Sequence, residues 1–291
     1  MRVREFPLFA ALLLVLPSCT ARPPDVAPRP VPVARPMPAP GSALPDDERR
    51  ALDRTLARYL RHRPGRAALA VHDRTTGTRY AFGGGGPFLL ASVAKVDILL
   101  ALLHGRRGGR LTGHERELAE RMIRHSDNDC AHELYLAIGG PDGLDRTLRR
   151  LGVRHTRPGS GLSWGYTRSG PSDQVRVLEL LTDPAGPLPA RDRRYALDLM
   201  SSVEPAQAWG VSAAAGPRGR VALKNGWLPA EAHDGLWTVN SVGRLLVNGH
   251  ELLIAVLSER SPEMATGIDT VERLARLAVT ALTRSPSTAK V

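Results

Sequence analysis

Lysine is almost absent from this chain of 291 residues. Lys95, Lys224 and Lys290 are the only lysines, and arginine supplies the rest of the 40 basic residues. The lysine amine is compact, and burial or a nearby charge can bring its pKa low enough for proton transfer, which does not happen with arginine. Because arginine serves here for ordinary positive charge, Lys95 and Lys224 are candidate functional residues. Lys290 lies in a polar tail, and we assign it no role.

Cysteine is also scarce, since Cys19 and Cys130 are the only two. Cys19 follows two arginines and the apolar run 6–16, a pattern typical of a secretory signal peptide and too short to span a bilayer comfortably. The end of this segment resembles a bacterial lipobox, in which the cysteine becomes the lipidated first residue of the mature chain. If Cys19 carries lipid, Cys130 has no partner for an internal disulfide. A signal peptide that is cut elsewhere, with Cys19 lost, is the alternative.

We expect four segments along the chain. Residues 1–19 form the lipoprotein signal peptide, and residues 20–45 form a disordered tether because proline, alanine and valine are dense there without an apolar period. Residues 46–284 form the folded domain, and residues 285–291 form a disordered tail. This organisation predicts an exported protein that is held at the outer face of the cell membrane as a lipoprotein or is secreted.

Aromatic residues make up only 4% of the chain, although the net charge is +11. The positive charges are scattered as single arginines and arginine pairs, without the basic stripe and interleaved aromatics that nucleic-acid grooves need. We therefore expect no nucleic-acid partner. An unspecific attraction to anionic lipid or wall polymer stays open. We expect a monomer whose ligand is a small molecule, with no cofactor or metal.

Apolar periodicity predicts helices at both ends of the folded domain and throughout its middle. The predicted helices are 46–63, 92–103, 113–125, 129–138, 142–151, 172–181, 192–201 and 266–283. Short apolar or alternating runs predict strands at 67–72, 79–82, 221–227, 236–242 and 252–257. We therefore predict an α/β fold with two parts. Residues 46–91 and 220–284 form a five-stranded antiparallel sheet flanked by the N- and C-terminal helices, and residues 92–219 form an all-α part. The active site should lie where these two parts meet.

Ser92 and Lys95 lie three residues apart at the start of a predicted helix that is apolar nearly all round and should be buried. This spacing places the hydroxyl and the amine on one face of the helix, one turn apart, where the amine can take the hydroxyl proton. A Ser-x-x-Lys pair alone is a weak signal because such pairs occur by chance. The scarcity of lysine strengthens this one.

Two tripeptides stand out further along the chain. Ser126-Asp127-Asn128 lies between two predicted helices, where short polar side chains are ordinary capping residues. Lys224-Asn225-Gly226 lies on a strand that we expect to be central in the sheet, where a lysine is out of place without a function and glycine lets a ligand approach closely. An edge strand with a solvated lysine is the alternative reading of the second tripeptide.

The three motifs in this order resemble the Ser-x-x-Lys, Ser-Asp-Asn and Lys-Thr-Gly set of class A β-lactamases and penicillin-binding proteins. The predicted order of elements also matches that family from residue 46 to the C-terminal helix. The resemblance implies that Ser92 is a nucleophile that forms an acyl-enzyme and that Lys95 accepts its proton. It implies that Ser126 relays a proton to the leaving nitrogen and that Lys224 holds this serine and a substrate carboxylate by charge.

The same resemblance implies a set of substrate-binding residues. Asn128 would hydrogen-bond the amide side chain of the substrate, and Asn225 stands where threonine is usual, although an amide can still donate to a carboxylate. The N–H groups of Ser92 and Trp227 would form an oxyanion hole, to which Gly226 gives access.

Besides Asn225, the chain departs from the family at three places. Class A β-lactamases deacylate with a glutamate on the loop that follows the Ser-Asp-Asn helix, and the matching stretch 152–171 contains no acidic residue. The segment between Lys95 and Ser126 is shorter than usual, which predicts a more open pocket. Leu236 and Trp237 stand where an arginine would assist carboxylate binding.

These observations favour a β-lactamase-related serine hydrolase that acts on β-lactams or related acyl-D-Ala amides, with slow deacylation. One alternative is a D,D-carboxypeptidase or small-ester hydrolase. Another is a non-catalytic penicillin-binding lipoprotein that keeps the fold and has lost turnover. Activity on an acyl-D-Ala-D-Ala peptide without action on penicillin would favour the first alternative, and binding without product would favour the second.

Overall fold

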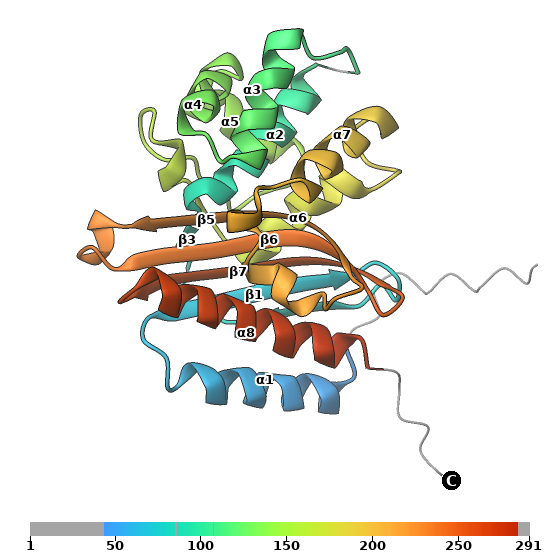
Figure 1. Cartoon of the computed structure of the whole chain (residues 1–291), viewed down its shortest axis with the longest axis vertical. Coiled ribbons are helices and arrows are strands. Elements are labelled where there is room, and N and C mark those ends of the chain that lie inside the picture. The colour runs from blue at the N-terminus through green and yellow to red at the C-terminus, as the bar shows by residue number, and fades with distance from the viewer. Residues whose placement is uncertain (1–43, 85, 107, 285–291) are drawn as a thin grey trace, which may run out of the picture. The chain divides into compact units, whose positions relative to one another are not determined.

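A five-stranded antiparallel sheet with the strand order β2-β1-β7-β6-β5 is the framework of the computed structural model, which describes residues 44–84, 86–106 and 108–284 (Figure 1). The strands of this sheet are β1 (Arg66–Asp73), β2 (Arg79–Phe82), β5 (Arg220–Pro229), β6 (Trp237–Val247) and β7 (His250–Ser261). The predicted α/β fold with an antiparallel sheet is confirmed. The predicted signal peptide, the lipidation site Cys19, the tether up to residue 43 and the C-terminal tail lie outside the described residues.

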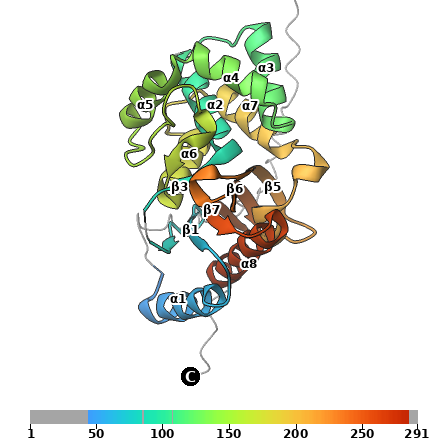
Figure 2. The same ribbon diagram turned by 90° about the vertical axis from the view of Figure 1, so that its left-hand side faces the viewer.

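Helices cover both faces of the sheet. α1 (Asp46–Leu60) and α8 (Met264–Leu282) lie together on one face, and the remaining helices lie on the other face (Figures 1 and 2). These remaining helices are α2 (Ala94–Gly105), α3 (Gly113–Arg124), α4 (Asn128–Ala137), α5 (Gly140–Arg150), α6 (Pro171–Thr182) and α7 (Ala190–Ser201). None of the helices in the described part of the chain is long and apolar enough to cross a membrane.

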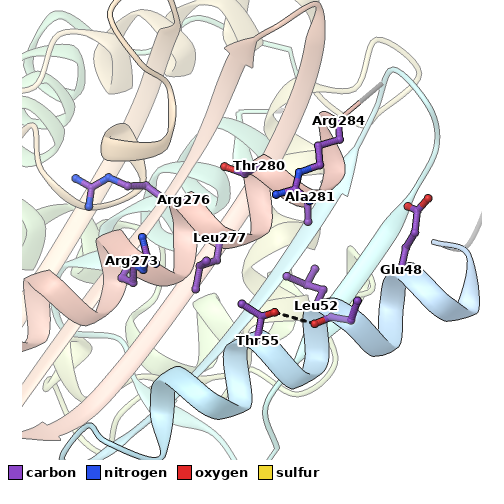
Figure 3. Close-up of a pocket in the computed structure, with 10 residues that line it drawn as sticks. Glu48, Leu52, Thr55, Arg273, Arg276, Leu277, Thr280, Ala281 and Arg284 are labelled. Atoms are coloured by element: carbon purple, nitrogen blue, oxygen red, sulfur yellow. Dashed lines mark hydrogen bonds between the residues drawn. The ribbon is translucent and has the colours of Figure 1, made fainter. Parts of the chain in front are cut away.

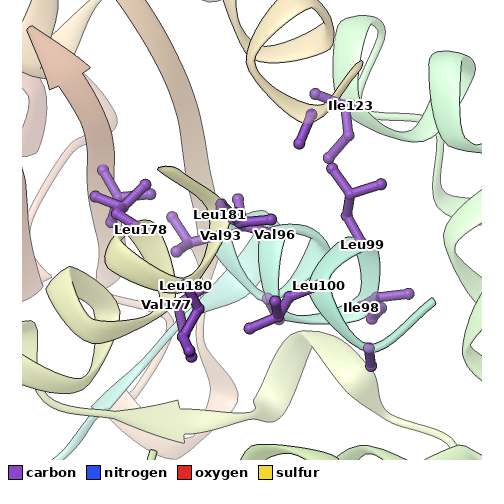
Figure 4. Packing of buried hydrophobic residues seen from close by; sticks show 14 of the residues in the cluster. Val93, Val96, Ile98, Leu99, Leu100, Ile123, Val177, Leu178, Leu180 and Leu181 are labelled. Atoms are coloured by element: carbon purple, nitrogen blue, oxygen red, sulfur yellow. The ribbon is translucent and has the colours of Figure 1, made fainter. Parts of the chain in front are cut away.

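The central helix α2 is buried along almost its whole length, as its sequence, apolar nearly all round, predicts. Its side chains form one hydrophobic cluster with α6 and α3, in which Val96 and Leu99 pack among Leu181 and Ile123 (Figure 4). Because the start of α2 cannot shift without disturbing this cluster, the residues at that end are held in fixed positions.

A separate cavity of about 480 Å³ lies between α1 and α8 (Figure 3). Leu52, Leu277 and Ala281 give it an apolar lining, and arginines of α8 stand at its sides. It lies among the helices on the face of the sheet opposite α2, so none of the motif residues contributes to it.

The prediction that the strand with Lys224 is central in the sheet was wrong, because β5 is an edge strand. The lysine is nevertheless fully buried, so the solvated edge lysine of the alternative reading is also absent. A short 3₁₀ helix, η1 (Ala91–Val93), packs against β5, as do α7 and the 3₁₀ helix η4 (Gly210–Ala214). Because these elements bury the side chains of β5, its apolar sequence pattern does not distinguish an edge strand from a central strand.

Candidate active site

Ser92 lies in η1, and Lys95 lies in the first turn of α2, directly after it. The two side chains meet as their spacing predicts, with 3.1 Å between Lys95 Nζ and Ser92 Oγ. Lys95 is fully buried, whereas Ser92 is partly exposed. A hydroxyl that a ligand can reach therefore contacts an amine that bulk water does not reach.

The second motif brings two more polar groups to the same amine. Lys95 Nζ donates to the carbonyl oxygen of Ser126 at 2.6 Å and to Asn128 Oδ1 at 2.8 Å, and it lies 3.0 Å from Ser126 Oγ. Asp127 caps α4 by accepting hydrogen bonds from the backbone N–H groups of Asp129 and Cys130, so it faces the helix rather than the amine. Within this tripeptide, Asp127 therefore caps the helix, whereas Ser126 and Asn128 contact the amine of Lys95.

Lys224 completes the cluster from the edge strand. Its Nζ lies 3.0 Å from Ser126 Oγ and donates to the carbonyl oxygen of Asn225 at 2.9 Å. The hydroxyl of Ser126 thus lies between two buried amines. Burial and the nearby charge of Lys95 hold the pKa of Lys224 well below its usual range.

Burial also lowers the pKa of Lys95 to about 7, against a smaller opposing effect of the Asp127 carboxylate. The geometry agrees with a neutral amine, which has two protons to donate and one lone pair. The Ser126 carbonyl and Asn128 Oδ1 can only accept, so they take the two protons. The lone pair is then left for a hydroxyl proton, and Ser92 Oγ at 3.1 Å and Ser126 Oγ at 3.0 Å are both within reach.

Gly226 is needed because the backbone of η1 crosses β5 at this residue. A Cβ atom at Gly226 would lie 2.6 Å from Leu90 O, 2.6 Å from Val93 N and 2.7 Å from Ser92 N. Any side chain here would push η1 away from the strand. The close approach brings the N–H of Ser92 to the backbone of β5 at Gly226, the residue before Trp227.

Asn225 and Trp227 point to the opposite face of β5 from Lys224, since side chains alternate along a strand. The Nδ2 atom of Asn225 donates to the carbonyl oxygens of Gln207 at 2.8 Å and Trp209 at 3.0 Å. Both of its protons are therefore in use within the protein. The ring of Trp227 packs against Trp209 edge to face, with 5.6 Å between their centroids, so only its backbone can face Ser92.

Two backbone conformations at the site are strained. Ala91, directly before Ser92, has φ 50°, and Ser126 has φ 57°, values that residues with a side chain rarely adopt. Such conformations persist only where surrounding contacts hold them, and they gather at functional sites. Nothing in the sequence around these two residues indicates them.

Asn240 on β6 holds the chain that leads into Ser92, and sequence reasoning missed it. Its Nδ2 donates to Leu89 O at 2.7 Å and Leu90 O at 3.1 Å, and its Oδ1 accepts from the N–H of Ser258 at 3.0 Å. The side chain is fully buried. A polar residue within an apolar strand was the available signal, but it does not reveal which distant segment it binds.

Trp164 is the second residue that the sequence analysis missed. Its ring lies over Lys95, with 4.8 Å from Nζ to the ring centroid. It belongs to a 3₁₀ turn, η2 (Trp164–Tyr166), in the loop 152–170. A lone tryptophan in a loop rich in glycine and serine was the signal, but composition alone gives it no partner. Within the described residues, no group of three or more His, Cys, Asp or Glu side chains is placed to hold a metal ion.

Solved structures of class A β-lactamases share this fold. A class A β-lactamase from Bacteroides cellulosilyticus has a TM-score of 0.68 and 17% identity over 81% of this chain and 98% of that one. The TLA-1 extended-spectrum β-lactamase has a TM-score of 0.72 and 15% identity over 81% of this chain and 100% of that one. PBP-A has a TM-score of 0.69 and 20% identity over 84% of this chain and 98% of that one. The fold is therefore that of class A β-lactamases.

The sequence places the chain in a family. The model of the Beta-lactamase enzyme family matches residues 110–282, which is more than half of the chain, and the chain belongs to this family. The matched range includes Ser126 and Lys224 and begins after Lys95. The resemblance seen in the three motifs is thereby confirmed at the level of the family.

The curated relatives cover a smaller part. The "Putative lipoprotein LppW" of Mycobacterium tuberculosis is 32% identical over 124 residues, as is the protein of the same name from Mycobacterium bovis. These 124 residues are 42% of this chain and 40% of the relative, so the chain spans less than half of the length of the relatives it matches.

Proposed function

We propose that this chain is an exported serine hydrolase whose Ser92 is acylated by β-lactams or related acyl-D-Ala amides. The resulting acyl-enzyme is then hydrolysed slowly. The observation that carries the proposal is the 3.1 Å contact between Ser92 Oγ and the buried amine of Lys95. An amine with a pKa of about 7 is present in substantial part as the neutral base near neutral pH. Membership of the β-lactamase family supports the proposed substrate class.

Acylation follows from this contact. Ser92 Oγ attacks the amide carbonyl carbon as its proton passes to Lys95 Nζ. The charge that develops on the carbonyl oxygen would be stabilised by the N–H groups of Ser92 and Trp227, and such a donor is worth about 3 kcal/mol in other serine enzymes. When the carbon–nitrogen bond breaks, the leaving nitrogen takes a proton from Ser126 Oγ. Ser126 recovers a proton from one of the two amines that lie 3.0 Å away.

Substrate binding would use the groups that remain. The exposed Asn128 is placed for contact with the amide side chain of the substrate, although its Oδ1 also serves Lys95. Lys224 supplies charge for a substrate carboxylate when it is protonated. Because both Nδ2 protons of Asn225 are in use, we assign Asn225 to the support of residues 207–209 in preference to direct binding.

Hydrolysis of the acyl-enzyme should be slow. Water must add to the acyl carbon, the bond from this carbon to Ser92 Oγ must break, and a water proton must return to Oγ. A base usually activates the water, and the loop 152–171 contains no carboxylate to do so. An ester formed on Ser92 would therefore persist.

Export and anchoring are part of the proposal. The relatives carry the name of lipoproteins, which supports a lipid on Cys19 and a position at the outer face of the cell membrane. Release of the full chain from a membrane fraction only by detergent, with loss of anchoring in Cys19→Ala, would test this part.

The function is tested by intact-mass measurements on residues 41–291 mixed with a penicillin, while the hydrolysed drug is followed in parallel. We expect a lasting adduct of one drug molecule per chain, absent in Ser92→Ala. Lys95→Arg should also fail to form it, because the charge stays and the proton acceptor is lost. Lys95→Met, which needs no buried charge, controls for misfolding and should be folded but unlabelled.

Other outcomes would point elsewhere. Rapid hydrolysis with no lasting adduct would identify a true β-lactamase with a base that lies outside the loop 152–171. Action on an acyl-D-Ala-D-Ala peptide or simple ester, but not on penicillin, would identify a carboxypeptidase or esterase. Binding without adduct or product would identify a ligand-binding lipoprotein, and labelling that survives in Ser92→Ala would remove Ser92 as the nucleophile.

A further inference from the structure

Trp164 covers the amine on which the proposed reaction depends. Its ring centroid lies 4.8 Å from Lys95 Nζ, and its side chain is only partly exposed. The neighbouring Tyr166 belongs to the same turn but is exposed. One aromatic side chain of this turn therefore faces into the site, and the other faces solvent.

The loop that carries Trp164 is fastened to the chain next to Ser92. The carbonyl oxygen of Trp164 accepts hydrogen bonds from Thr167 Oγ1 at 2.7 Å and Thr167 N at 3.1 Å. The carbonyl oxygen of Thr167 in turn accepts from the N–H of Leu90 at 2.8 Å. Directly beside this bond, β3 (Phe88–Leu89) pairs with β4 (Arg168–Ser169). Because Thr167 is fully buried, this connection is protected from competing water.

A second network holds the base of the same loop. Asp173 Oδ2 accepts from the N–H of His155 at 2.7 Å and from Thr156 Oγ1 at 2.9 Å, and Thr156 Oγ1 lies 2.7 Å from Ser169 Oγ. Both ends of the loop 152–170 are thus fixed against the body of the protein. The backbone that carries Trp164 is therefore held in place, and the ring lies over Lys95 and packs against the hydrophobic cluster around α2.

The chemistry of the indole determines what it can do there. Its ring nitrogen can donate a hydrogen bond but cannot accept a proton, so it cannot act as the base for a water molecule. Its bulk removes water from the side of Lys95 that it covers, and its ring face attracts the charged form of the amine. Exclusion of water acts on hydrolysis of the ester, and both effects act on the basicity of Lys95.

We propose that Trp164 is a positioning residue that slows hydrolysis of the Ser92 acyl-enzyme by keeping water from the Lys95 side of the ester. This inference rests on the proposed function and adds a residue that sets the lifetime of the adduct. The lack of a carboxylate in the loop would slow hydrolysis but would still let water reach the ester, whereas Trp164 would keep water away from it.

The experiment separates formation of the adduct from its decay. Wild type, Trp164→Ala, Trp164→Phe and the matched control Tyr166→Ala are labelled with a penicillin, freed of excess drug by rapid desalting and followed by intact mass. We expect the Trp164→Ala adduct to decay roughly tenfold or more faster, whereas Phe, which keeps an aromatic ring, and Tyr166→Ala stay near wild type. Thermal unfolding of each variant checks that the loop change has not unfolded the domain.

The pH dependence of labelling separates the proposed role of Trp164 from a merely structural one, which would leave the pH dependence unchanged. Loss of burial raises the pKa of Lys95, whereas loss of the attraction to the ring face lowers it. Because burial is the largest cause of the lowered pKa, the midpoint of the labelling rate should shift to higher pH in Trp164→Ala but not in Tyr166→Ala. Equal decay and an equal midpoint in wild type and Trp164→Ala would overturn the inference and leave the proposed function intact. Labelling of Trp164→Ala but not of wild type would also overturn it, since Trp164 would then block acylation. If no variant is labelled, the proposed function fails, and this inference fails with it.

Discussion

The amine of Lys95 lies 3.1 Å from the hydroxyl oxygen of Ser92 and is fully buried. Ser126 O and Asn128 Oδ1 can take the two protons of a neutral amine, which leaves the lone pair for the hydroxyl of Ser92 or of Ser126, whose Oγ lies 3.0 Å away. In the proposed mechanism, the protonation state of this buried amine decides whether the Ser92 hydroxyl can be activated. This relationship gives the first prediction.

The rate of labelling by a penicillin should rise with pH and level off above about 7. Burial lowers the pKa of Lys95 to about 7, so the fraction of neutral amine grows about tenfold per pH unit below that value. The measurement is the second-order labelling rate between pH 5 and 9, with circular dichroism to confirm that the protein stays folded. A rate that is flat across this range would show that Lys95 is not the proton acceptor.

Gly226→Ala should slow labelling while the domain stays folded. The added methyl group would lie within 2.7 Å of Leu90 O and Ser92 N, so η1 has to move away from β5 and carry Ser92 with it. We expect a loss of about tenfold or more in the labelling rate. Gly113→Ala at the start of α3 is the matched control, because a Cβ there meets no atom of the described residues within 4 Å. Equal rates in the two variants would show that the close approach has no part in acylation.

Asn240→Ala should weaken both labelling and stability. The change removes the donor to Leu89 O and Leu90 O and leaves the N–H of Ser258 without its acceptor, and each buried polar group left unpaired costs about 1–3 kcal/mol. Urea unfolding gives the stability, and the labelling rate reports the position of Ser92. Asn240→Asp keeps the acceptor for Ser258 but loses the donors. If Asn240→Asp is labelled as fast as wild type, the contacts of Asn240 with Leu89 O and Leu90 O do not position the nucleophile.

The sequence predicted most of the fold because the signals were local. Helix α2 is apolar on all sides, and Asn248-Gly249 joins β6 to β7 with positive φ at both residues, as a tight hairpin turn requires. The position of β5 could not be predicted in the same way. Its apolar pattern records burial, and burial by η1 and η4 gives the same pattern as burial by another strand.

The site was predictable where chemistry and spacing coincide. Lysine scarcity drew attention to Lys95 and Lys224, and both amines lie 3.0 Å from Ser126 Oγ. Trp164 and Asn240 escaped notice because their roles depend on contacts between segments about 70 and 150 residues apart in the chain. Tertiary contacts of that kind leave no periodic mark in the sequence.

Asp97 on α2 is fully buried. Nε2 of Gln174 lies 3.3 Å from each of its carboxyl oxygens. Burial raises the pKa of Asp97 to about 8, so the folded protein keeps this proton between pH 4 and 8 while the unfolded chain releases it. The contribution of Asp97 to stability is therefore full below pH 4 and declines as the pH rises through this range.

Asp97→Asn carries no proton to lose, so the free energy of unfolding of this variant relative to wild type should increase from pH 5 to pH 8. The upper limit is about 1.4 kcal/mol per pH unit. Urea unfolding at the two pH values measures it, with the exposed Asp47→Asn as the control. A constant difference between Asp97→Asn and wild type would mean that Asp97 is ionised in the folded protein. The buried carboxylate would then need a compensating group that its contacts with Gln174 do not supply.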